Sequence, residues 1–94
     1  MLDTKTIIKS IIEHQQMVIG PLALEQANKV SGLKINNGDH LQVNLTSKNS
    51  KVILTELVKR YEQLFGRASV EVCRDAVREI SPPVSITELP DILK

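Results

Sequence analysis

The side chains that could carry out chemistry are few: one thiol, Cys73, and two imidazoles, His14 and His40. A cysteine nucleophile needs a base beside it and a third group that orients this base. Helical spacing over residues 67–80 instead places Cys73 on an apolar stripe. A buried cysteine acts as a small hydrophobic residue with a raised pKa. We therefore interpret Cys73 as a core residue, and a small enzyme using its thiol is our second alternative hypothesis.

The two histidines have no partners that suggest metal binding or catalysis. His14 lies at the edge of an apolar helical stripe, and His40 alternates to the polar side of a predicted strand. Neither has a cysteine, a histidine or a carboxylate at the spacing of a zinc site. We interpret both as surface or boundary residues. We expect no catalytic residue, no cofactor site and no metal site, so the sequence predicts a protein that is not an enzyme.

Several carboxylates follow one row of a predicted helix. Glu71, Asp75 and Glu79 are interleaved with Arg74 and Arg78. Ion pairs three residues apart on a solvated helix face stabilise the helix by about 0.2–0.5 kcal/mol each. The sequence therefore predicts the pairs Glu71–Arg74 and Asp75–Arg78 rather than a catalytic pair of carboxylates.

The N-terminal third of the chain predicts two helices. Residues 4–19 form an amphipathic helix, which Gly20-Pro21 interrupts because proline cannot continue the helical hydrogen bonds. A second helix runs from Pro21 to about Val30, and Gly32 ends it in the left-handed conformation. The apolar stripe of the first helix consists of Ile7, Ile8, Ile11, Ile12, Gln15, Val18 and Ile19.

The middle of the chain predicts one β-hairpin, because apolar and polar residues alternate on both sides of a turn within residues 33–45. A two-residue turn at Asn37-Gly38 would place the apolar residues of the two strands on opposite faces. A three-residue loop, Asn36-Asn37-Gly38, pairs Leu33 with Leu41 and keeps all apolar residues on one face. We predict the three-residue loop.

The C-terminal half predicts helical structure over residues 50–65 and 67–80. One straight helix through Gly66 would rotate the apolar stripe by about 100° between its halves. A break or sharp bend at Gly66, with Ser69 capping a new helix, removes this mismatch. The sequence leaves open whether residues 50–80 form one bent helix or two.

Aromatic residues are scarce: the chain has one tyrosine, one phenylalanine and no tryptophan. The core must therefore be built from isoleucine, valine and leucine, with Tyr61 and Phe65 one helical turn apart. If Phe65 is fully buried, its truncation to alanine costs about 3–5 kcal/mol. If it is exposed, Phe65 becomes a candidate anchor for a partner protein.

Length and composition exclude several classes of protein. The 94 residues, of 10.5 kDa, fit one domain, which we place at residues 1–81 with a proline-containing tail at 82–94. Twelve basic residues nearly balance eleven acidic ones, and one cysteine excludes a disulfide scaffold. No segment approaches the ~20 apolar residues that span a bilayer. The N-terminus lacks the pattern of a secretory signal, so we expect a cytoplasmic protein.

Nucleic-acid binding is our first alternative hypothesis. Residues 24–32 resemble the helix and glycine turn that open a helix-turn-helix motif, and a winged-helix-like regulator could use the hairpin as its wing. The next residues, 33–38, predict a strand and a turn instead of a recognition helix. Residues 47–70 carry five basic side chains against two acidic ones, a smaller surplus than a typical nucleic-acid face.

These elements together predict a small α+β domain of order ααββαα, with one β-hairpin covered by helices. A two-stranded hairpin is marginally stable alone and leaves both outer edges open. We therefore expect dimerisation to complete the fold. The leading functional hypothesis is a non-catalytic protein–protein interaction or regulatory module, homodimeric, with an unidentified protein partner. We expect its binding surface on the apolar side of residues 70–80 or at the hairpin edge.

Overall fold

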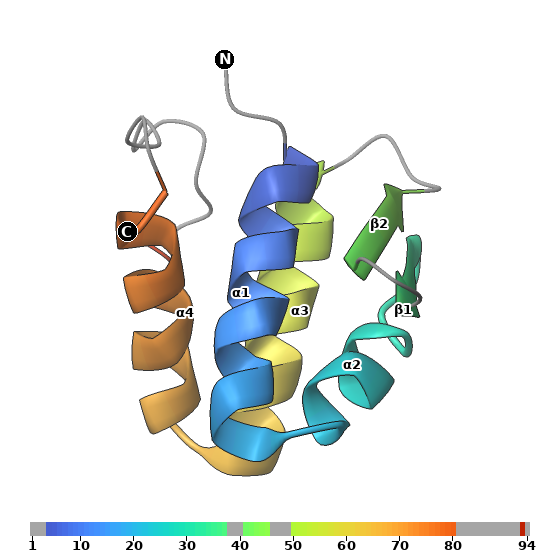
Figure 1. Cartoon of the computed structure of the whole chain (residues 1–94). Helices are drawn as coiled ribbons and strands as arrows, with labels where there is room; N and C mark the ends of the chain where they lie inside the picture. The colour runs from blue at the N-terminus through green and yellow to red at the C-terminus, as the bar shows by residue number, and fades with distance from the viewer. Residues whose placement is uncertain (1–3, 38–40, 46–49, 81–92, 94) are drawn as a thin grey trace.

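A computed structural model shows the α+β fold of order ααββαα that the sequence predicts, and it describes residues 4–37, 41–45, 50–80 and 93. Three helices, α1, α3 and α4, lie alongside one another, and the hairpin with α2 lies on one side of them (Figure 1). None of the helices in these ranges is long and apolar enough to cross a membrane. The elements are α1 (Thr4–Ile19), α2 (Leu22–Ala27), β1 (Leu33–Asn37), β2 (Leu41–Leu45), α3 (Ser50–Phe65) and α4 (Ala68–Arg78).

The core lies between the helices and the inner face of the hairpin. The predicted stripe of α1 is buried apart from its last residues, because Val18 is exposed and Ile19 only half-buried. Leu93, the one described residue of the predicted tail, is buried in the same core. The buried apolar residues of the six elements are Ile7, Ile8, Ile11, Ile12, Ala23, Ala27, Leu33, Ile35, Val43, Ile53, Leu54, Leu57, Val58, Tyr61, Val70, Cys73, Ala76 and Val77.

The second helix is shorter than predicted, because α2 ends at Ala27 and not near Val30. The N–H of Lys29 bonds the carbonyl of Gln26, and the N–H of Val30 bonds that of Ala27, both at 3.1 Å. These bonds span three residues, so the backbone tightens into turns instead of continuing the helix. Gly32 then adopts the predicted left-handed conformation, with φ +84°.

The predicted hairpin register is wrong, although the apolar residues do share one face. Leu33 pairs with Leu45 and Ile35 with Val43, in place of Leu33 with Leu41. Shifting a register by an even number of residues preserves the face, so alternation alone could not distinguish the two pairings. The observed register sets Ile35 opposite the apolar Val43, whereas the predicted one puts it opposite Asp39. Residues 38–40, and with them His40, lie outside the described residues.

Two separate helices, α3 and α4, meet at Gly66, which has φ +85°. The predicted break is therefore confirmed, but the predicted cap is wrong, because α4 begins at Ala68 and Ser69 is buried inside it. The N–H of Ser69 bonds the carbonyl of Gly66 at 3.1 Å, and that of Val70 bonds Arg67 at 3.0 Å. Backbone carbonyls thus accept these bonds, so the turn forms without a side-chain cap.

Candidate functional site

The apolar side of α4, one of the two predicted binding surfaces, is not free. Val70, Cys73, Ala76 and Val77 are buried within the chain, where α4 packs against α1 and α3. The prediction of a binding surface on residues 70–80 is therefore wrong. Periodicity identified the apolar side correctly, but it could not show that two other helices cover it.

Four large hydrophobic side chains are exposed where several helices end. Met17 (79% exposed) and Val18 (63%) lie in the last turn of α1, Leu22 (44%) begins α2, and Leu64 (53%) lies in the last turn of α3. Figure 1 shows the ends of α1 and α3 and the starts of α2 and α4 together at the lower end of the view. We call these four residues the helix-end surface. Large apolar side chains exposed at one end of a domain are candidates for an interaction site.

Cys73 is a core residue, as predicted. Its side chain is fully buried, and the side-chain amide of Gln15 donates to its Sγ at 3.3 Å and to the carbonyl of Ser69 at 3.0 Å. Burial raises the pKa of the Cys73 thiol to about 11, although the bond from Gln15 lowers it in part. A thiol that stays protonated at neutral pH and is closed to solvent is a poor nucleophile.

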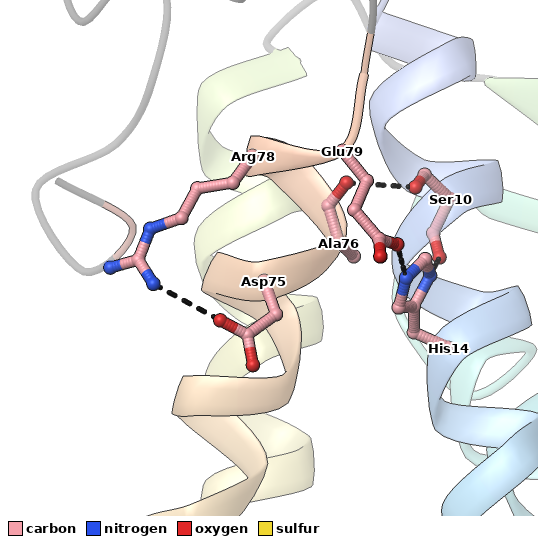
Figure 2. A network of polar contacts seen from close by, with 6 residues as sticks. All are labelled: Ser10, His14, Asp75, Ala76, Arg78 and Glu79. Carbon is pink, nitrogen blue, oxygen red and sulfur yellow. Dashed lines mark hydrogen bonds and ion pairs between the residues drawn. The ribbon is translucent and has the colours of Figure 1, made fainter.

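His14 lies half-buried at the boundary between α1 and α4, as predicted for a boundary residue, and pairs with Glu79 (Figure 2). Its Nδ1 lies 2.9 Å from the carbonyl of Ser10, whose hydroxyl donates to the carbonyl of Ala76 at 3.0 Å. A carbonyl and a carboxylate only accept, so both ring nitrogens of His14 donate when the imidazole is protonated. Burial lowers the pKa of His14, but the bonds to Ser10 and Glu79 outweigh it and leave the pKa above 6.5.

The two predicted ion pairs on the solvated face of α4 are confirmed. Arg74 bonds Glu71 at 2.9 Å, and Arg78 bonds Asp75 at 3.0 Å, the second pair being drawn in Figure 2. Glu79, predicted to belong to the same solvated row, instead reaches across to α1. The sequence offered no signal for that contact, because His14 and Glu79 are 65 residues apart.

A polar hollow of about 280 Å³ lies between the end of α2 and one side of α3. Lys29, Lys59 and Arg60 line it together with one carboxylate, that of Glu56. The Nε of Arg60 donates to the side-chain carbonyl of Gln26 at 3.0 Å, which fixes the guanidinium at the rim. Part of the basic surplus of residues 47–70 therefore gathers in one place.

Within the described ranges, no group of three or more histidine, cysteine, aspartate or glutamate side chains could hold a metal ion. No family model matches the chain, and searches of curated proteins and of solved structures give no significant match.

Proposed function

We propose that the protein is a non-catalytic protein–protein interaction module with a regulatory role in the cytoplasm, and that it acts as a homodimer. The observation that carries this proposal is the helix-end surface, where four large apolar side chains are exposed. Water contact with these groups is unfavourable, and burying them against a partner releases roughly 25 cal/mol per Å² of apolar area.

A second copy of the chain suits the helix-end surface. In a two-fold dimer the same surface meets itself, so an uncharged apolar set is complementary to its own copy. None of Met17, Val18, Leu22 and Leu64 carries a charge, and the net charge of +1 per chain gives little repulsion. Dimerisation through paired hairpin edges is less favoured, because Asn28 already bonds the outer edge of β1 through the N–H of Ile35, at 2.7 Å.

Sedimentation equilibrium at micromolar concentration tests this proposal. We expect the wild-type protein to show twice the 10.5 kDa chain mass. Met17→Asp and Leu64→Asp, each placing a charge in the proposed interface, are expected to shift the mass towards the monomer while circular dichroism stays unchanged. Val52→Asp is the matched control, since Val52 is 51% exposed but lies in the first turn of α3, at the opposite end. A wild-type monomer, or dimers of all variants, would contradict the proposal.

Nucleic-acid binding remains the second candidate, and the polar hollow of Lys29, Lys59 and Arg60 is the observation that favours it. Phosphate binding through such a cluster weakens steeply with salt. A labelled duplex or single strand that binds the wild type at about 50 mM salt, and binds Lys59→Gln more weakly, would support this candidate. Absence of binding at that salt concentration would exclude it.

A further inference from the structure

The polar hollow between the end of α2 and one side of α3 brings together cations from two separate segments of the chain. On α3, Lys59, Arg60 and Gln63 follow one another at helical spacing, so they share the face that borders the hollow. Lys29 lines it from the turn after α2, where its backbone N–H bonds the carbonyl of Gln26 at 3.1 Å. The fold therefore holds positive charge from both segments in one place.

The three cations of the hollow are open to a ligand. Lys29 and Lys59 are exposed, and neither forms an ion pair within residues 4–37, 41–45, 50–80 and 93. The Nε of Arg60 is held by Gln26, and its two terminal nitrogens bond no other residue that the structure describes. The planar guanidinium matches the oxygens of a phosphate, and one already held in place loses little freedom on binding. The hollow thus offers a positioned arginine flanked by two lysines.

The charge and the size of the hollow match a single phosphate group. Three cations and the carboxylate of Glu56 give the described lining a net charge of +2. A phosphate monoester carries about −1.5 to −2 at neutral pH and accepts hydrogen bonds through three oxygens. At about 280 Å³ the hollow is smaller than the sites of drug-sized ligands, which run to roughly 300–1,000 Å³.

The charge of the remaining chain favours a small ligand over a nucleic acid. The whole chain carries +1, so the residues outside the hollow together carry a net charge of −1. On α4, Arg74 and Arg78 already pair with carboxylates. A nucleic acid usually binds along a stripe of basic side chains that follows its backbone. Here the positive charge is concentrated in one hollow.

We propose that the polar hollow binds the phosphate group of a small molecule, whose oxygens are held by Lys29, Lys59 and Arg60. Ser31, which also lines the hollow, adds a hydroxyl donor. This inference goes beyond the proposed homodimer and does not require it, because the hollow shares no residue with the helix-end surface. It concerns the same residues as the nucleic-acid candidate, so the experiment must separate the two sources of phosphate.

NMR titration of the isotope-labelled protein at constant ionic strength tests the inference. The probes are adenosine monophosphate and inorganic phosphate, with adenosine as the counterpart that lacks phosphate. We expect both phosphate probes to shift the amide signals of Lys29, Ser31 and Lys59 until the shifts saturate, and adenosine to leave them unchanged. Equal shifts with adenosine, or shifts with phosphate no larger than those with chloride, would overturn the inference.

Three charge variants locate the phosphate in the hollow. Lys59→Gln is expected to weaken binding of adenosine monophosphate about threefold, and Glu56→Gln to tighten it about twofold, because the first removes a cation and the second the carboxylate. Lys51→Gln is the matched control: it makes the same change on an exposed lysine of α3 outside the hollow, and we expect it to bind as the wild type. Equal weakening by Lys51→Gln and Lys59→Gln would contradict a site in the hollow.

A single-stranded oligonucleotide without terminal phosphates separates the two sources of phosphate. It carries only phosphodiesters, and we expect it to bind more weakly than adenosine monophosphate at the same ionic strength. If it binds more tightly, and Lys59→Gln weakens its binding, the hollow is a nucleic-acid site and the inference is wrong. A dimer that binds neither phosphate probe would also overturn the inference but would leave the proposed homodimer intact.

Discussion

Among single residues, Tyr61 shows how one of the two aromatic side chains contributes to the core. Its ring is fully buried, and its hydroxyl donates to the carbonyl of Ala23 at 2.7 Å, which joins α3 to α2. Burial raises the pKa of the phenol well above its usual 10, so the hydroxyl stays protonated and continues to donate. Phe65, one turn further, is only half-buried and packs against the core from outside. Phe65 therefore lies between the two alternatives that the sequence left open, full burial and exposure.

Truncating the two aromatic residues should give unequal losses of stability. Tyr61→Ala removes a fully buried ring and is expected to lower the free energy of unfolding by about 3–5 kcal/mol. Phe65→Ala is expected to cost clearly less. Because Tyr61→Ala could unfold the domain, Tyr61→Phe is the milder probe, with a loss of about 0.5–1.5 kcal/mol from the hydrogen bond to the Ala23 carbonyl. Urea unfolding measures all three, and a larger loss for Phe65→Ala than for Tyr61→Ala would contradict the packing.

The His14–Glu79 pair should make stability depend on pH. The pKa of His14 is raised in the folded protein, so the folded state binds this proton more tightly than the unfolded state. The resulting stabilisation is fully present below the unfolded value of 6.5 and is lost as the pH rises through the folded pKa. A pair this exposed contributes about 0.2–1 kcal/mol.

Thermal unfolding of wild type and Glu79→Gln at pH 5.5 and 8.5 measures this effect. We expect the wild type to melt at a higher temperature than Glu79→Gln at pH 5.5. We expect this difference in melting temperature to shrink at pH 8.5. Asp75→Asn, which breaks an ion pair with an arginine, is the control, and its effect should not change over this range. If Glu79→Gln lowers the melting temperature equally at both pH values, the contact with Glu79 does not raise the pKa of His14.

Among the secondary-structure elements, the connection between α3 and α4 depends on the backbone conformation of Gly66. Gly66 has φ +85°, and a Cβ added there would meet no atom within 4 Å. A substitution at Gly66 is therefore resisted by the backbone alone, with no contribution from crowding. Left-handed backbone costs an ordinary residue about 1–2 kcal/mol, and asparagine tolerates it better than alanine.

Gly66→Ala is expected to lower the free energy of unfolding by about 1 kcal/mol, and Gly66→Asn by less. Chemical denaturation of the two variants beside the wild type checks the order. Stabilisation by Gly66→Ala would mean that α3 continues into α4 without the left-handed turn, the alternative that the sequence left open.

Periodicity predicted most of the elements but not how they end or pair. The three long helices were predicted to within two residues, because their apolar residues recur every three to four positions. The end of α2 was predicted too late, because nothing in Asn28 or Lys29 marks where helical bonds change to tight turns. The apolar face of the hairpin was predicted correctly, but its register was not. The face is the same for any shift of the pairing by an even number of residues, whereas the register also depends on which residue stands opposite each apolar one.

The candidate binding surfaces depend on how all the elements pack together in the whole molecule. They were therefore the features hardest to predict from the sequence. The spacing of Val18 places it on the apolar stripe of α1, yet it is exposed, since periodicity gives the direction of a side chain but not which elements cover it. The polar hollow likewise requires that Lys29 and Lys59, far apart in the sequence, lie together. Composition alone could indicate only that a small domain with an open hairpin gains from a partner.

The most direct test of dimerisation is to dilute the isotope-labelled protein from millimolar to low micromolar concentration and follow its NMR spectrum. If two copies meet through the helix-end surface, the changes in chemical shift will concentrate at Met17, Val18, Leu22 and Leu64 and will be small around Val52. A spectrum that does not change with concentration, together with a monomeric mass, would contradict dimerisation through the helix-end surface. So would changes confined to the hairpin.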